Sequence, residues 1–255
     1  MNKNAIVFAL NYYDNDNSDK NKDYYLMLCY ALETLYKNLK SGIDVIVCYD
    51  MSRKPKTKYD IFENFSQAQF IEIKYEIKNE YERMFYKWFC VDHVFSKYNY
   101  DRLFILDVDV IFYQDPILFF EKYNDTKKLY CLDEAETHVE IQKVLDTTKG
   151  INGGQILLSR NIYQKFQSLH KTMLQERLDL DKRARCLDKY FYDWIMKDLS
   201  DQYCLTNLIC KLNIPIDFFD VKDICYGVGC PDTKILHYFS SLSKKFLPQK
   251  LINED

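Results

Sequence analysis

Two aspartates stand close together after one of the most apolar stretches of the chain. Asp107 and Asp109 follow Leu103–Leu106, whose sequence is Leu-Phe-Ile-Leu. Such a run predicts a buried strand, and in open α/β sheets ligands bind at the carboxyl ends of the strands. Carboxylates are hard oxygen ligands that suit Mg²⁺ or Mn²⁺, and such an ion can neutralise charge on a departing diphosphate. A strand that simply ends in an aspartate turn gives the same pattern, so two interpretations stay open.

Three later stretches carry polar or small residues where elements are expected to begin or end. Gly153 and Gly154 precede an expected strand, where glycine allows a ligand to approach the backbone or simply makes a turn. Asp201 stands where a helix is expected to begin, a position that the helix dipole favours for a carboxylate. His237 lies in a late expected strand, where a single histidine is a metal ligand or a structural residue. Each stretch alone is ambiguous.

The elements that would position these residues alternate between strand and helix. Apolar runs predict strands over 5–10, 44–48, 70–73, 103–106, 128–132, 155–159, 214–219 and 234–239. Apolar residues at helical spacing predict helices over 24–39, 81–98, 161–174 and 187–197. This order predicts an α/β fold with a mostly parallel central sheet and helices on both faces.

The composition excludes several functional classes. The 255 residues suffice for one sizeable core, and the net charge of −3 gives no electrostatic footprint for nucleic acid. Neither a dinucleotide-binding glycine pattern nor a P-loop occurs. Nine cysteines without a C-x-x-C pair indicate a reducing compartment. Since no signal peptide or transmembrane stretch is found, we expect a cytoplasmic protein, or one trimmed from an anchored enzyme.

Taken in order, these stretches resemble the glycogenin-like retaining glycosyltransferases, which have the GT-A (Rossmann-like) fold. The sequences at 100–112 (YDRLFILDVDVIF), 151–157 (INGGQIL), 201–207 (DQYCLTN) and 235–238 (ILHY) are similar to that family's D-x-D, N-[SAG]-G-[VI], D-Q-x-x-L-N and I-x-H-[FY] motifs. The resemblance covers roughly residues 5–246. It implies a single GT-A domain over 1–255, with a nucleotide-binding part at about 1–112 and an acceptor part at about 113–255.

The resemblance implies how a UDP-sugar donor and its metal are bound. The residues concerned are Asp107, Asp109 and His237 as ligands of Mn²⁺ (or Mg²⁺), Val108 between the aspartates, Leu10, Asn11 and Tyr12 at the nucleotide base, and Lys87 near the donor. The family's K-P-W is offset here to Lys244-Lys245-Phe246, and Lys244 is our candidate for the diphosphate. Ser240 replaces a family glycine.

The resemblance also implies which residues handle the sugar. Asn152, Gly153 and Gly154 would lie beside the donor sugar, together with Asp133 at the end of an expected strand. Asp201 would bind the sugar hydroxyls, and Gln202 would lie near the anomeric carbon. Asp133, Asp201 and Gln202 are therefore the catalytic candidates, and transfer with retention of anomeric configuration is expected.

The expected activity is Mn²⁺-dependent transfer of a hexose or N-acetylhexosamine from a UDP-sugar to an unknown glycan, protein or lipid acceptor. A homodimer is left open. A non-catalytic nucleotide-sugar-binding or scaffold protein on the same fold is one alternative. A haloacid dehalogenase-type phosphatase is another, although its D-x-D usually follows the first strand and is followed by glycine, which is not the case here.

Overall fold

The computed structural model describes residues 3–12, 18–40, 42–51, 60–76, 82–134, 142–145, 150–198, 200–226 and 235–237. The chain forms two compact units that are each discontinuous in sequence. Unit 1 comprises Met1–Lys3, Glu76–Ile105 and Asp125–Phe219, and unit 2 comprises Asn4–Tyr75, Leu106–Asn124 and Asp220–Asp255. The expected division at about residue 112 stays a prediction.

Unit 2 contains three parallel strands, of which the first two in the chain carry continuous runs of buried residues. β1 (Asn4–Tyr12), β2 (Asp44–Met51) and β3 (Gln69–Glu72) lie in the order β3-β2-β1. Their apolar runs do not alternate with polar residues: Ala5, Ile6, Val7 and Phe8 are all buried. Continuous apolar runs of this kind are typical of parallel strands with both faces covered.

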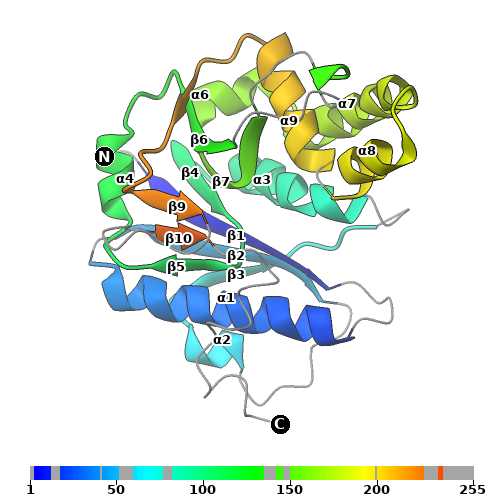
Figure 1. Cartoon of the computed structure of the whole chain (residues 1–255). Helices are drawn as coiled ribbons and strands as arrows, with labels where there is room; N and C mark the ends of the chain where they lie inside the picture. The colour runs from blue at the N-terminus through cyan, green and yellow to red at the C-terminus, as the bar shows by residue number, and fades with distance from the viewer. Residues whose placement is uncertain are drawn as a thin grey trace. The chain divides into compact units, whose positions relative to one another are not determined.

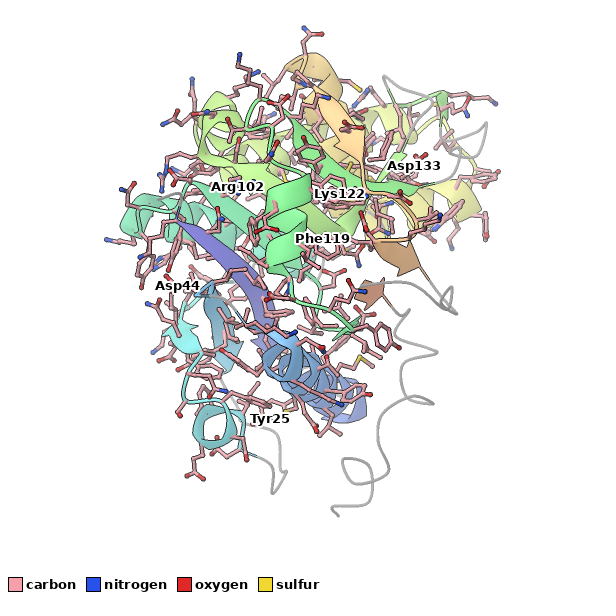
Figure 2. The ribbon with its side chains drawn as sticks, turned by 90° about the vertical axis from the view of Figure 1, so that its left-hand side faces the viewer. Tyr25, Asp44, Arg102, Phe119, Lys122 and Asp133 are labelled. Atoms are coloured by element: carbon pink, nitrogen blue, oxygen red, sulfur yellow. The ribbon has the colours of Figure 1, made fainter. Side chains whose placement is uncertain are left out.

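The helix α1 (Ser18–Asn38) packs against unit 2 through one apolar stripe. Tyr25, Leu28, Leu32 and Leu35 recur every three or four residues and are fully buried. The Tyr25 hydroxyl accepts a hydrogen bond from the Ile61 amide at 2.8 Å, which ties α1 to α2 (Ile61–Asn64; Figures 1 and 2). The helix begins at Ser18, several residues before the expected start at residue 24.

A second, three-stranded sheet completes unit 2. β5 (Val110–Phe112), β10 (Ile235–His237) and β9 (Ile224–Tyr226) lie in that order, and β10 runs antiparallel to β5. Side chains of α1 hold β5 through both backbone groups of Phe112 (Figure 1). Its amide donates to Thr34 Oγ1 at 3.2 Å, and its carbonyl accepts from Asn38 Nδ2 at 2.9 Å. The helix α4 (Ile117–Lys122) follows β5.

Unit 1 contains the other four strands of a mixed, mostly parallel seven-stranded sheet. They are β4 (Arg102–Leu106), β7 (Gly150–Ser159), β6 (Leu129–Glu134) and β8 (Ile216–Phe218), in the order β4-β7-β6-β8. β6 is parallel to β8 and antiparallel to β7. The predicted α/β class is therefore confirmed, with β7 as an antiparallel member.

The helical part of unit 1 is more broken than its apolar pattern predicts. Its helical segments are η1 (Glu82–Phe85), α3 (Tyr86–Lys97), α6 (Arg160–Tyr163), η2 (Gln164–Phe166), α7 (Leu169–Ala184), α8 (Lys189–Asp193), the π-helix η3 (Trp194–Asp198) and α9 (Ser200–Lys211). The single helix expected over 161–174 is interrupted at Gln167, whose φ is 62°. A new helix then begins because Asp92 of α3 accepts bonds from the amides of Leu169 and His170.

Candidate functional site

The strand β7 leaves its regular ladder at the glycines. Leu132 pairs with Asn152, whereas the preceding Cys131 pairs with Ile156, so residues 153–155 form a bulge. A bulge frees backbone groups from the ladder and often lies beside an active site. Here the Gly153 carbonyl accepts from Lys87 Nζ at 2.7 Å, and the Gly153 amide donates to Gln202 Oε1 at 3.1 Å. The bulge thus joins α3, β7 and α9.

Asp201 is the acidic centre of this arrangement. It lies in the first turn of α9, where the helix dipole favours a negative charge. Its Oδ2 accepts a hydrogen bond from Trp88 Nε1 at 3.2 Å and lies 4.0 Å from Lys87 Nζ. The side chains of Lys87 and Asp201 are only 14% and 13% exposed. A cation and an anion are therefore held in place in a poorly solvated position, where their charges act strongly on a polar ligand.

Further hydrogen bonds fix α9 against β7. Thr206 Oγ1 donates to the Gln202 carbonyl at 2.9 Å and lies 3.5 Å from the amide of Ile151 on β7. The Asn152 side chain is buried and accepts from the amide of Gly154 at 2.8 Å. We call the following set the α3–β7–α9 cluster: Lys87, Trp88, Asn152, Gly153, Asp201 and Gln202. All six lie in unit 1.

The space beside Gly153 is filled by α9. A Cβ atom at this position would lie 3.7 Å from Gln202 Cβ and 3.8 Å from Asp201 Oδ2. These are ordinary van der Waals distances, so a single methyl group at this position would fit against α9. The close neighbour of Gly153 is therefore the helix that carries Asp201 and Gln202, two of the three catalytic candidates.

Asp133 lies on β6, the strand that pairs with β7, but it is not the residue directly opposite Asn152. It is exposed at the end of β6, where Figure 2 labels it, and it pairs with Ile151. Asn152 pairs instead with Leu132. Because successive strand residues point to opposite faces, this register separates Asp133 from Asn152 at the strand end.

The candidates for the nucleotide base end β1 in unit 2. Leu10 is buried, and Asn11 and Tyr12 pair in register with Asp50 and Met51 of β2. The Nδ2 of Asn11 is buried and has no hydrogen-bond partner within the described part of the chain. A buried donor without a partner is costly, so this atom fits a position that a polar ligand completes. The Tyr12 side chain lies outside the described residues.

The metal candidates of unit 2 lie directly before β5 and on its neighbour β10. Asp107 and Asp109 are half-buried on either side of the buried Val108, directly before β5. The antiparallel register places His237 opposite Val110, the residue after Asp109. Carboxylate oxygens and an imidazole nitrogen are donors that Mn²⁺ accepts. Among the described side chains, which do not include that of His237, no group of three metal-binding residues is found. Lys244 lies outside the described residues.

Sequence reasoning missed three residues of this region. Trp88 is fully buried, and a buried indole N–H needs a partner, which here is Asp201. Its place beside Lys87 in the sequence was the available signal. Thr206 gave no signal, because its role depends on the packing of α9 on β7. Gln155, in the bulge, is fully buried, and both polar atoms of its amide lack a hydrogen-bond partner within the described residues.

The fold is that of several solved glycosyltransferases. Mouse xyloside xylosyltransferase 1 matches with a TM-score of 0.60 and 13% identity, over 92% of this chain and 97% of that protein. The galactosyltransferase LgtC, in complex with donor and acceptor sugar analogs, matches with a TM-score of 0.61 and 13% identity, over 97% of this chain and 94% of LgtC. A glycosyltransferase involved in the glycosylation of the major capsid of PBCV-1 matches with a TM-score of 0.50 and 10% identity, over 95% and 98% of the two chains.

These matches confirm the predicted GT-A fold and, at such low identity, establish the fold alone. No protein-family model and no curated protein matches the sequence. In the described part of the chain, no helix combines the length and apolar character needed to cross a membrane.

Proposed function

We propose that this protein is a glycosyltransferase that moves a hexose or N-acetylhexosamine from a UDP-sugar to an acceptor, with Mn²⁺ (or Mg²⁺) and with retention of anomeric configuration. The observation that carries the proposal is the α3–β7–α9 cluster, in which Asp201 and Gln202 are held by Trp88 and the Gly153 amide. The shared fold also supports the proposal, since this chain matches two solved transferases over nearly their whole length.

In unit 1, the proposed task is to hold the donor sugar. Asp201 keeps its carboxylate beside Lys87 and Trp88, so it is available to accept hydrogen bonds from sugar hydroxyls. Gln202 is fixed through its Oε1. A neutral amide is a poor nucleophile, so a covalent intermediate on Gln202 is disfavoured and attack from the front face gives retention. The active site of LgtC also contains a glutamine, as its glutamine-to-glutamate active-site mutant indicates.

In unit 2, the proposed task is to hold the nucleotide. The unpartnered Nδ2 of Asn11 would donate to an oxygen of uracil. Tyr12 would stack on the base, an interaction typically worth ~1–3 kcal/mol. Asp107, Asp109 and His237 would ligate the divalent ion, and Lys244 would contact the diphosphate. A bound divalent ion stabilises negative charge on the leaving diphosphate.

The test is a screen of nucleotide sugars for slow hydrolysis, which needs no acceptor. We expect UDP release from at least one UDP-sugar, loss of the activity in EDTA, and recovery with Mn²⁺. Faster hydrolysis of GDP-sugars would contradict the donor assignment. Binding of a UDP-sugar without any turnover would favour the non-catalytic alternative, and hydrolysis of simple phosphate esters would favour a phosphatase.

Once an acceptor is known, the stereochemistry has a direct measurement. The coupling of the anomeric proton in freshly formed product, measured by NMR, should show an α-linkage from an α-linked donor. A β-linked product would overturn the retaining assignment and would require an Asp or Glu to act as a base.

A further inference from the structure

The short helix α8 is unusual because none of its residues is buried. Its sequence is Lys-Tyr-Phe-Tyr-Asp and is followed by Trp194. Helices of globular proteins normally bury their apolar stripe. Here Tyr190 is 71% exposed, and Phe191 and Trp194 are only half-buried. The hydrophobic core therefore gives no account of this concentration of aromatic residues.

The three rings of Tyr190, Phe191 and Trp194, which we call the aromatic cluster, pack on one another. Their centroids are 5.3 Å apart for Tyr190–Phe191, 6.3 Å for Tyr190–Trp194 and 6.4 Å for Phe191–Trp194. These are ordinary separations for interacting aromatic pairs. The rings thus support one another as one surface and leave a large part of Tyr190 in contact with solvent.

Hydrogen bonds fix the helix that carries the cluster. Asp188 caps α8 by accepting from the Phe191 amide at 3.1 Å. Tyr192 on the same helix donates its hydroxyl to Asp181 Oδ1 of α7 at 2.6 Å. A surface held in this way loses little conformational entropy when it binds a ligand, which is the general requirement for a preformed site.

The aromatic cluster belongs to the same unit as the catalytic candidates and is connected to them by a short segment. Trp194 begins the π-helix η3, and α9 begins at Ser200, so Asp201 follows within its first turn. The π-helix η3 contacts both α8 and α9, which Figure 1 draws in yellow and gold. π-Helices are rare and are frequently found at functional sites. The cluster is therefore placed where it can act with α9.

We propose that the aromatic cluster is the binding surface for a neutral carbohydrate acceptor, an assignment that rests on the proposed transferase function. The C–H face of a sugar ring packs on aromatic side chains, and its hydroxyls find polar partners at the rim. Asp188, Lys189 and Asp193 provide such a rim. Their net negative charge disfavours polyanions and anionic lipid surfaces, because like charges repel.

The size of the aromatic cluster favours a small ligand over a protein. One aromatic side chain buries at most ~250 Å², and these three already cover one another in part. A stable protein–protein interface needs about 800 Å² from each partner. A mono- or oligosaccharide needs far less surface, so the cluster matches it without further contacts.

The chain offers a fluorescence assay that reports on this surface. Trp88 and Trp194 are its two tryptophans, and Trp88 is fully buried. Quenching by acrylamide therefore reports mainly on Trp194, and Trp194→Phe identifies its share of the signal. The probes are lactose, maltose, xylobiose and chitobiose. We expect at least one of them to protect Trp194 from acrylamide in a saturable manner.

The matched variants are Tyr190→Ala, which removes the exposed ring, and Leu212→Ala, which truncates an exposed apolar residue directly after α9. Tyr190→Ala should weaken saccharide binding roughly tenfold, the size expected for one lost stacking partner. Leu212→Ala should bind as the wild type does. Protection that is absent for all four saccharides, or unchanged in Tyr190→Ala, would overturn the assignment. Protection by phosphatidylserine vesicles in place of saccharides would overturn it in favour of a membrane surface.

Hydrolysis of the UDP-sugar separates this assignment from the proposed function. It needs no acceptor, so Tyr190→Ala should retain it at the wild-type rate. If the wild type binds a saccharide at Trp194 but hydrolyses no nucleotide sugar, then the transferase proposal fails and the carbohydrate site stands. If hydrolysis occurs without saccharide protection, then the acceptor surface is elsewhere.

Discussion

The two groups of candidate residues are held in different ways. In unit 1, Asp201 and Gln202 are fixed by side-chain hydrogen bonds to α3 and to the β7 bulge. In unit 2, Asp109 directly precedes β5. The backbone of β5 pairs with β10 and is hydrogen-bonded by side chains of α1. One group therefore depends on particular side chains, and the other depends mainly on strand register.

An ion pair between the half-exposed Lys122 and the buried Asp223 supports the strands beside the second group. Asp223, which is 3% exposed before β9, accepts bonds from Tyr123 Oη and from Lys122 Nζ, and Figure 2 labels Lys122 on α4. This contact fixes the segment that leads into β9, which in turn pairs with β10. This contact, like those that α1 makes with β5, does not involve the side chains of Asp107 and Asp109. The α3–β7–α9 cluster lacks this separation, because its candidates are also part of its scaffold.

The largest effect should follow from Asp109→Asn. The change removes a charge, keeps the size of the side chain and leaves the β5 ladder, so the loss of activity should exceed the loss of stability. Activity should fall at least ~10²–10³-fold, as expected when charge stabilisation of a leaving group is lost. Rates of UDP-sugar hydrolysis and donor titrations with and without EDTA measure it. The control is Asp217→Asn, which removes an exposed pair with Lys128. EDTA-sensitive activity that survives in Asp109→Asn would show that Asp109 is not a ligand.

Trp88→Phe should affect both stability and activity, in contrast to Asp109→Asn. It removes the indole donor of Asp201 and leaves a poorly solvated carboxylate with one partner fewer. We expect a loss of about 1–3 kcal/mol in the free energy of unfolding. Misplacement of Asp201 should lower the rate of hydrolysis by up to ~10²-fold. Urea unfolding and hydrolysis rates are the measurements, and Trp194→Phe is the matched control for stability. Equal stability of the two variants would show that the hydrogen bond does not hold Asp201.

These differences also explain how far the sequence predicts the molecule. Continuous apolar runs predicted the strands of the seven-stranded sheet and β10, because burial leaves a local signature, and Asp107 was correctly placed after β4. The short strands β5 and β9 were not predicted. The direction of β7 was not predictable, since an apolar run contains no information on its partner. The Trp88–Asp201 bond joins residues 113 positions apart and arises only from tertiary packing. The start of α7 likewise involves a distant residue, since Asp92 of α3 accepts bonds from the amides of Leu169 and His170.

Acid should loosen unit 1 before unit 2. Burial lowers the pKa of His170 below its ordinary value of 6.5, although Asp92 and Glu82 act in the opposite direction and Lys171 adds to the shift. Burial, with Lys97, also lowers the pKa of His93. The unfolded chain therefore binds these protons more readily, so stability that is present above pH 6.5 is lost as the pH falls through the lowered pKa values.

Hydrogen exchange at pH 7 and pH 5, corrected for intrinsic rates, measures this difference. Amides of α3 and α7 should lose more protection than those of β1 and β2. His170→Phe, which keeps an aromatic ring beside Phe89, should reduce the pH dependence. Earlier loss of protection in β1 and β2 would mean that carboxylates of unit 2 dominate the acid response.

The smallest effect should come from Gly153→Ala. This variant tests whether α9 or the donor sugar lies against the backbone at Gly153. Both hydrogen bonds of Gly153 use backbone atoms, which alanine retains. The added Cβ would make ordinary contacts, at 3.7 Å to Gln202 Cβ and 3.8 Å to Asp201 Oδ2. The free energy of unfolding should therefore change by less than ~1 kcal/mol. The matched control is Gly42→Ala, whose Cβ would have no neighbour within 4 Å. Because α9 fills this space, donor affinity in Gly153→Ala should stay at the wild-type level. A variant of normal stability that binds the donor weakly would instead show that the sugar itself approaches the backbone at Gly153.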